Sequence, residues 1–225
     1  MKKLFLIITI LCLIFSNLFG MDFSIGPTVG SEVIQSYSTY TGSTDSYPYP
    51  SLLARPNLGF VSNFDFDNFG IQFDVNFSFS KLETAYYNST KKIYDRKLKE
   101  GDSTINICLI PYYSFVQENF KISVGPVLGF SFYNYNSEQI DNLGNKQSQS
   151  KDFMSEFIWG GEVSFSHDLN SKMDIYLSLP ILANTGLIDR SYKIDGTESK
   201  TTKNKYFGIS KKLYAIPKMG ILFKF

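Results

Sequence analysis

The sequence predicts an all-β fold, a closed up-and-down antiparallel barrel of about eight strands. Apolar and polar residues alternate with a period of two in eight separate segments. Only a β-strand places alternate residues on opposite faces. The connections between these segments are alternately short and long, as expected when strands run up and down around a ring.

The clearest segment runs from Phe69 to Phe79. Its odd-numbered residues are all Phe, Ile or Val, and its even-numbered residues are Gly, Gln, Asp, Asn and Ser. No helix could present that pattern on one face. Seven other segments alternate in the same way, at about residues 23–30, 58–66, 105–115, 120–132, 157–165, 173–181 and 213–225.

The short connections contain Asn and Asp, which favour tight turns; they lie at residues 67–68, 117–119 and 168–171. Long polar stretches, expected to be loops, occupy roughly residues 34–53, 82–102, 136–152 and 183–205. We expect strands of about 9 to 11 residues, the length of a tilted crossing of a bilayer. Four prolines interrupt these strands, and because each lacks a backbone N–H we expect a bulge or a lost hydrogen bond at each; they are Pro27, Pro111, Pro126 and Pro217.

Alternation alone does not say which face points inward, so a soluble lipocalin-like binding barrel is an alternative. An apolar interior would have to hold about thirty large side chains, and an eight-stranded barrel has little room beyond ordinary filling. The polar face carries many glycines together with charges that can pair across a narrow lumen. These charges are Glu32, Arg55, Asp65, Asp74, Lys121, Glu156, Glu162, Asp174, Lys218 and Lys224. We therefore expect a transmembrane barrel with its apolar face, including Trp159, toward lipid.

The N-terminal residues predict a secretory signal peptide. Two lysines precede an apolar run from Leu4 to Phe15, and the small residue Gly20 follows. The run is too short to span a bilayer as a helix, which needs about 20 residues. We expect cleavage after Gly20, so that residues 1–20 are the signal peptide and the barrel domain, residues 21–225, begins at Met21.

Charge and cysteine content exclude several classes of function. The chain has 22 basic and 21 acidic residues, and the signal peptide holds two of the basic ones, so nothing indicates a nucleic-acid partner. Only Cys108 survives maturation, which rules out an intrachain disulfide and a cysteine-based metal site. No catalytic motif is present. The single histidine, His167, stands beside Asp168 at a short turn and could in principle act as a base, but we expect no enzyme, cofactor or metal.

The C-terminal strand carries a pattern of its own. Lys218 is followed two residues later by Gly220, and hydrophobic residues, Phe223 and Phe225, occupy the third-from-last and last positions. This pattern resembles the assembly signal of bacterial outer-membrane β-barrels. From residue 21 onward the chain resembles the small eight-stranded outer-membrane proteins of the OmpA-barrel and OmpX-like type. The resemblance implies a place in the outer membrane of a diderm bacterium, short periplasmic turns, long extracellular loops, contact with outer-membrane lipid, and insertion by the barrel assembly machinery.

Three classes of function remain open. A non-catalytic surface or structural protein acting through its extracellular loops is favoured, because function tends to lie in long loops on a rigid scaffold. The alternatives are a narrow small-solute pore and a lipid-modifying or proteolytic enzyme, although enzymes of such barrels place a histidine near the outer rim and this chain has none there. The basic stretch 82–102 could contact lipopolysaccharide phosphates or an acidic partner, or could be a solvated loop.

Overall fold

The computed structural model describes residues 21–39, 48–88, 93–141, 143–194, 197–201 and 212–225. The predicted signal peptide, with Gly20, lies outside the described residues, and so do the side chains of most of the basic stretch 82–102. Within the described part of the chain, no helix has the length and apolar character needed to cross a bilayer.

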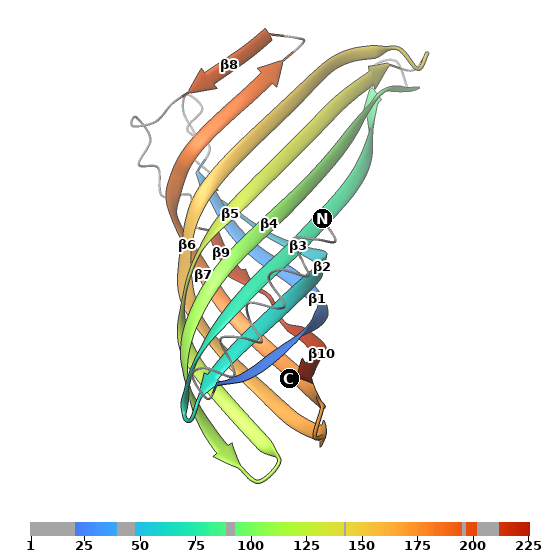
Figure 1. The fold of residues 1–225 in the computed structure, drawn as a ribbon. Coiled ribbons are helices and arrows are strands. Elements are labelled where there is room, and N and C mark those ends of the chain that lie inside the picture. Colours follow the sequence, from blue (N-terminus) through green and yellow to red (C-terminus); the bar gives the residue numbers. More distant parts are fainter. Residues whose placement is uncertain (1–20, 40–47, 89–92, 142, 195–196, 202–211) are drawn as a thin grey trace, which may run out of the picture.

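Seven long antiparallel strands and one divided strand form the wall of the molecule (Figure 1). The seven are β1 (Asp22–Thr39), β2 (Pro48–Phe66), β3 (Phe69–Asn88), β4 (Ile93–Gln117), β5 (Phe120–Asp141), β6 (Lys146–Asn170) and β7 (Met173–Ile194). The divided strand consists of β9 (Lys212–Ala215) and β10 (Lys218–Lys224), and β10 pairs with both β1 and β7. The sheet therefore closes into a ring, and the predicted barrel of about eight strands is confirmed. A short outer strand, β8 (Thr197–Thr201), pairs with β7.

The strands are much longer than predicted. Strands β1 to β7 contain 18 to 25 residues, where 9 to 11 were expected. Most of the residues expected in long loops continue the strands as paired hairpins; β5 and β6, for example, pair as far as Ile140 and Lys146. In the outer part of the β5–β6 hairpin, consecutive residues are polar, as at 137–139 and 146–151, so the sequence there loses the period-two signal although the backbone ladder continues.

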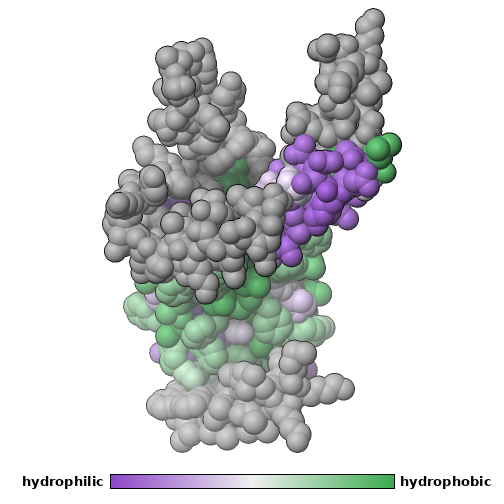
Figure 2. Space-filling view, turned by 90° about the horizontal axis from the view of Figure 1, so that it is seen from above, coloured by the Kyte–Doolittle hydropathy of each residue, from purple (hydrophilic) through white to green (hydrophobic). Residues whose placement is uncertain are grey.

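Alternate residues face opposite media, as predicted. On β3 the Phe73 and Val75 side chains are 49% and 42% exposed, while the neighbouring Asp74 and Asn76 are each 1% exposed. Exposed large apolar residues occur on β1 to β7 and on β9 and β10, and so form a belt around the described wall. One face of this belt, with hydrophilic residues beyond it, is seen in Figure 2. Trp159 faces outward in this belt. The lipocalin-like alternative, with an apolar interior and a polar surface, is therefore wrong.

Tight turns join the strands at the inner end. Residues Asp67 and Glu118 adopt positive φ angles of 54° and 52°, in two-residue turns that match the predicted positions. The third turn lies at residues 171–172, slightly later than predicted, because β6 continues to Asn170.

The prolines interrupt the backbone pairing between strands but introduce no bulges. Pro111 and Pro126 lie opposite each other, and the β4–β5 ladder is interrupted between the pairs Leu109–Leu128 and Tyr113–Val124 without a change of register. The β1–β10 ladder skips Pro27 in the same way, and Pro217 separates β9 from β10. The prediction of a bulge or a lost bond at each proline is confirmed as lost pairing, and the register shifts lie elsewhere.

One seam of the barrel opens toward the outer end. The β2–β3 ladder ends at the pair Asn57–Ser78. Beyond that pair, β2 continues with β1 as far as Pro48, and β3 continues with β4 as far as Asn88. The outer wall is therefore divided between β2 and β3.

Candidate functional site

The lumen is the first place to look for a site, because a solute crossing the barrel would have to pass through it. Its middle is filled by apolar side chains in two buried clusters: Cys108, Ile110, Val127, Ile158, Leu182, Tyr214 and Ile216 form one, and Val61, Tyr176 and Leu222 form the other. These residues pack as a core, as expected inside eight strands.

The tyrosines of this filling were expected inside the lumen, whereas its aliphatic members were not. Alternation assigns aliphatic residues to the outer face, yet Ile110 and Leu182 occupy polar-face positions beside Leu109 and Ile181. Such adjacent apolar pairs inside an alternating strand were the available signal, because one member of each pair must face the lumen.

An ion-pair cluster lies on the outer side of this core. The Arg55 guanidinium pairs with Glu32 and with Asp102 Oδ1 at 2.8 Å, and it donates to Thr104 Oγ1 at 2.8 Å. Glu32 also accepts from Asn106 Nδ2 at 3.2 Å. Asp102 was expected in a loop, but it faces the lumen and supplies a second carboxylate to Arg55.

A second cluster joins four strands in the middle of the lumen. Lys218 on β10 forms a fully buried ion pair with Asp74 on β3. Nearby, Glu162 Oε1 on β6 accepts hydrogen bonds from Gln72 Nε2 and from the Tyr176 hydroxyl, both at 2.8 Å. The predicted pairing is confirmed for eight of the ten lumen charges, whereas Glu156 and Glu162 accept hydrogen bonds from tyrosine hydroxyls. Each opposite charge offsets part of the cost of removing its partner from water.

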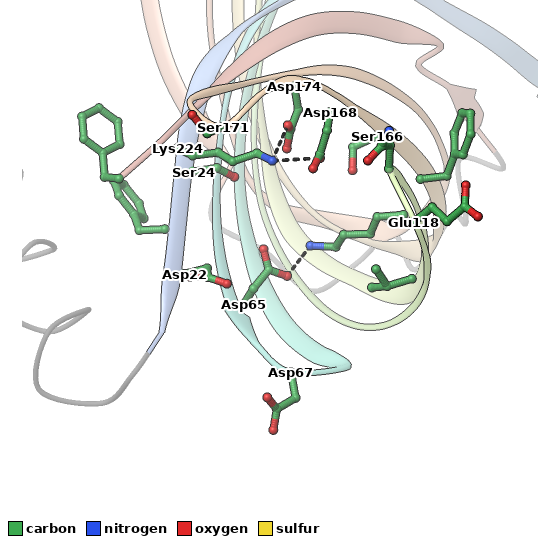
Figure 3. A pocket seen from close by; sticks show the side chains of 16 residues that line it. Asp22, Ser24, Asp65, Asp67, Glu118, Ser166, Asp168, Ser171, Asp174 and Lys224 are labelled. Atoms are coloured by element: carbon green, nitrogen blue, oxygen red, sulfur yellow. Dashed lines mark hydrogen bonds and ion pairs between the residues drawn. The ribbon is translucent and has the colours of Figure 1, made fainter.

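A cavity of about 400 Å³ opens at the inner end of the barrel. Two lysines form ion pairs there: Lys121 pairs with Asp65, and Lys224 pairs with Asp174 at 2.7 Å and Asp168 at 2.8 Å (Figure 3). All lining residues belong to inner turns or inner strand ends. The cavity is therefore a mouth of the lumen and does not extend through the core.

His167 does not form a catalytic pair with its neighbour. Its ring stacks on Phe120 with centroids 4.6 Å apart, and its Nδ1 lies 3.1 Å from the Asn119 carbonyl oxygen. Asp168 is instead paired with Lys224. Among the described residues, no three His, Cys, Asp or Glu side chains are grouped so that they could hold a metal ion.

The residues of the predicted assembly signal all lie on the closing strand β10 or directly after it. Lys218 points into the lumen, whereas Phe223 and Phe225 are exposed on the outer face. Gly220 lies opposite Thr28 on β1, and the Phe225 N–H donates to the Phe23 carbonyl at 2.9 Å. The strand thus completes the ring, while its recognition during assembly and cleavage at Met21 stay predictions.

Similar solved structures have low sequence identity to this chain. A major outer membrane protein from Thermus thermophilus is 14% identical, with 91% of this chain and 99% of that chain covered and a TM-score of 0.53. OprG from Pseudomonas aeruginosa is 12% identical, with 91% and 95% covered and a TM-score of 0.49. Neisserial surface protein A is 12% identical, with 90% and 97% covered and a TM-score of 0.43.

No curated protein matches the chain significantly in sequence. The family model described as "Outer membrane protein beta-barrel domain" matches residues 15–189, which is more than half of the chain. The exposed apolar belt accordingly faces the lipid of a bacterial outer membrane. The chain belongs to the family of outer membrane protein β-barrel domains.

Proposed function

We propose that this protein is a non-catalytic surface protein that acts through its extracellular hairpins. The observation that carries the proposal is the filled lumen. Two buried apolar clusters and two ion-pair clusters occupy the interior, so the described interior serves as a scaffold. Functional residues are then sought at the ends of the strands, where loops on a rigid scaffold commonly bind partners.

The β5–β6 hairpin shows how such an extracellular end is organised. The Asp141 carboxylate accepts hydrogen bonds from the backbone N–H groups of Leu143 at 2.9 Å and Asn145 at 2.7 Å. It also accepts from the side chains of Asn145 and Gln147. Leu143 stands at this tip with 81% of its surface exposed. These hydrogen bonds already restrict the turn, so a partner that binds at Leu143 would lose less conformational entropy than one that binds an unrestrained loop.

Cysteine labelling tests the outward orientation of the hairpins. The only native cysteine of the barrel domain, Cys108, is buried and should give little background. We expect Leu143→Cys to react with a membrane-impermeant maleimide on intact cells, and Asn68→Cys at an inner turn to react only after the outer membrane is permeabilised. The reverse pattern would contradict the proposal.

Planar-bilayer recording tests the narrow-pore alternative, which the inner cavity of about 400 Å³ favours. We expect the refolded protein to form no stable openings of porin size, because the apolar core lies outward of that cavity. Any small conductance should change when Lys218 or Glu162 is neutralised. Stable large openings would favour transport over a surface role.

The barrel assembly machinery is the partner proposed for the C-terminal strand. Deleting Phe225 should reduce the folded, protease-resistant fraction in cells more than it reduces the stability of protein refolded in detergent. Equal losses in the two assays would indicate that Phe225 acts through packing alone.

A further inference from the structure

The closing strand carries the cation for two buried acids of the lumen. Lys218 on β10 forms an ion pair with Asp74 on β3, and the two side chains are 0% and 1% exposed. Glu162 on β6 is also buried, and the Lys218 ammonium attracts its carboxylate. Among the described residues the only other buried cation is Arg55, which is paired within the outer ion-pair cluster. Asp74 and Glu162 therefore depend on Lys218 for an opposite charge.

The contact between Lys218 and Asp74 depends on a closed ring. In the sheet β10 is followed by β1, β2 and β3, so the ion pair crosses the lumen over two intervening strands. Gly30 on β1 is paired with Lys218, and a β-carbon at Gly30 would lie only 2.8 Å from Lys218 Cβ. The two strands can therefore approach this closely only without a side chain at Gly30. In a sheet still open between β10 and β1, β10 would be joined to β3 only through β7, β6, β5 and β4.

Strands β1 to β7 contain the two acids but not their cation. β10 pairs with β1 on one side and with β7 on the other, so a sheet that lacks β10 ends at β1 and β7. If those two edges paired directly, the smaller ring would enclose Asp74 and Glu162 without Lys218. A buried charge that has lost its partner is strongly destabilising, whereas an open sheet leaves both carboxylates in water. The acids therefore disfavour a ring that leaves out β10.

We propose that Lys218 is an electrostatic latch for barrel closure. Asp74 and Glu162 oppose closure of a sheet that lacks β10, and β10 removes this opposition when it brings Lys218 into the lumen. The polar residue of the C-terminal pattern then acts inside the finished barrel, a role that is separate from recognition by the assembly machinery. It is also separate from the surface role of the extracellular hairpins.

Removing the charge and restoring the balance at a second site tests the latch in the mature chain, residues 21–225. Lys218→Gln keeps a polar residue in the C-terminal pattern and should lower the equilibrium constant for folding into lipid vesicles about a hundredfold or more. Lys218→Gln/Asp74→Asn has the net charge of the unmodified lumen and should recover most of this loss. Lys224→Gln is the matched control. Lys224 lies on the same strand with its side chain 29% exposed, so its loss should cost much less.

Hydrogen exchange locates the effect of Lys218→Gln. Amides of β10 and of its neighbours β1 and β7 should lose protection first, while the β4–β5 ladder on the opposite side of the ring stays protected. A uniform loss of protection would indicate general destabilisation and would contradict the latch. Folding of Lys218→Gln to the same extent as the unmodified protein would overturn it. A defect that Asp74→Asn does not relieve would also overturn it, because Lys218 would then be needed for a reason other than the lumen acids.

Discussion

The β2–β3 and β4–β5 hairpins start from similar two-residue inner turns and differ at their outer ends. The β4–β5 ladder loses pairs at Pro111 and Pro126, resumes in the same register, and continues to Arg96 and Asp141. The β2–β3 ladder ends at Asn57 and Ser78. A proline in a strand is therefore not sufficient to end a ladder, and something further must separate β2 from β3.

The residues just beyond the last β2–β3 pair explain how the separated strands are held. Pro56 lacks the backbone N–H that could donate a hydrogen bond to β3. The Arg55 guanidinium lies in the lumen and contacts Asp102 and Thr104 on β4. Beyond Asn57, side-chain contacts between β2 and β4 therefore replace the backbone hydrogen bonds that join β2 to β3 nearer the inner end. The outer closure between β2 and β3 therefore depends on Arg55, whereas β4 and β5 are held by many backbone hydrogen bonds.

The largest expected effect comes from removing this side chain. Arg55→Ala should lower the free energy of unfolding by about 3–5 kcal/mol, because it leaves Glu32 and Asp102 without their cation inside the lumen. Urea unfolding in lipid vesicles, followed by the fluorescence of the only tryptophan, Trp159, measures the change. Arg55→Lys keeps the charge but not the planar set of donors, so its stability should fall between those of Arg55→Ala and the unmodified protein. A loss below about 1 kcal/mol would mean that the seam closes without Arg55.

A smaller effect should separate the two faces of β3, where β2 and β3 are still paired. Val75→Arg places a charge on the lipid-facing surface and should cost about 2–4 kcal/mol if the site lies near the bilayer midplane. The neighbouring Asn76→Ser, on the lumen face, should cost much less. Equal responses in the same unfolding experiment would contradict the assignment of faces.

The inner end of the β3–β4 ladder should show a smaller effect still. Gly70 lies opposite Tyr112, and a β-carbon at Gly70 would come within 2.5 Å of Tyr112 Cε2. Tyr112 is held in place by a 2.7 Å hydrogen bond from its hydroxyl to Asp65. Gly70→Ala should therefore destabilise by about 1–3 kcal/mol through overpacking. In a Tyr112→Phe background, where the ring is free to shift, the same alanine should cost less.

The smallest effect is local to the β5–β6 tip. The hydrogen bond from the Asn145 N–H keeps the pKa of the Asp141 carboxyl below its usual range. Because the folded pKa is lowered, the order that this carboxylate gives to the tip is present at neutral pH and is lost as pH falls through that lowered value. Asp141→Ala should speed hydrogen exchange at Leu143 and Asn145 without changing global unfolding. Unchanged exchange would show that the tip is held by its strands alone.

The belt of the barrel could be predicted from sequence because lipid constrains one face of each strand. Phe73 and Val75 were assigned outward, and Asp74 inward, from alternation alone. Alternation also identified Arg55, Lys218 and the lumen acids as one set. It could not identify pairs, because a partner across the lumen depends on register and barrel closure, and these involve strands far apart in the chain.

Other features carried no usable periodicity. Asp102 fell within a stretch that looked like a loop, since consecutive residues around it are polar. The β2–β3 ladder ends near the limits of the alternating segments 58–66 and 69–79, but the β4–β5 ladder continues far beyond the segments 105–115 and 120–132. The end of the alternating pattern therefore does not by itself predict the end of a ladder. The apolar lumen core was hidden because residues such as Ile110 look like extensions of an outward stripe.

The length of the β5–β6 hairpin has a mechanical consequence. Its two strands pair from the inner mouth, at Phe120 and His167, to the tip at Ile140 and Lys146. From Phe130 in the belt to Ile140 the strand runs about 33 Å at roughly 3.3 Å per residue. A force applied at the tip along this stalk loads many backbone hydrogen bonds in shear at once. Because the strands continue into the barrel wall, pulling by a bound partner would be resisted by the embedded barrel itself.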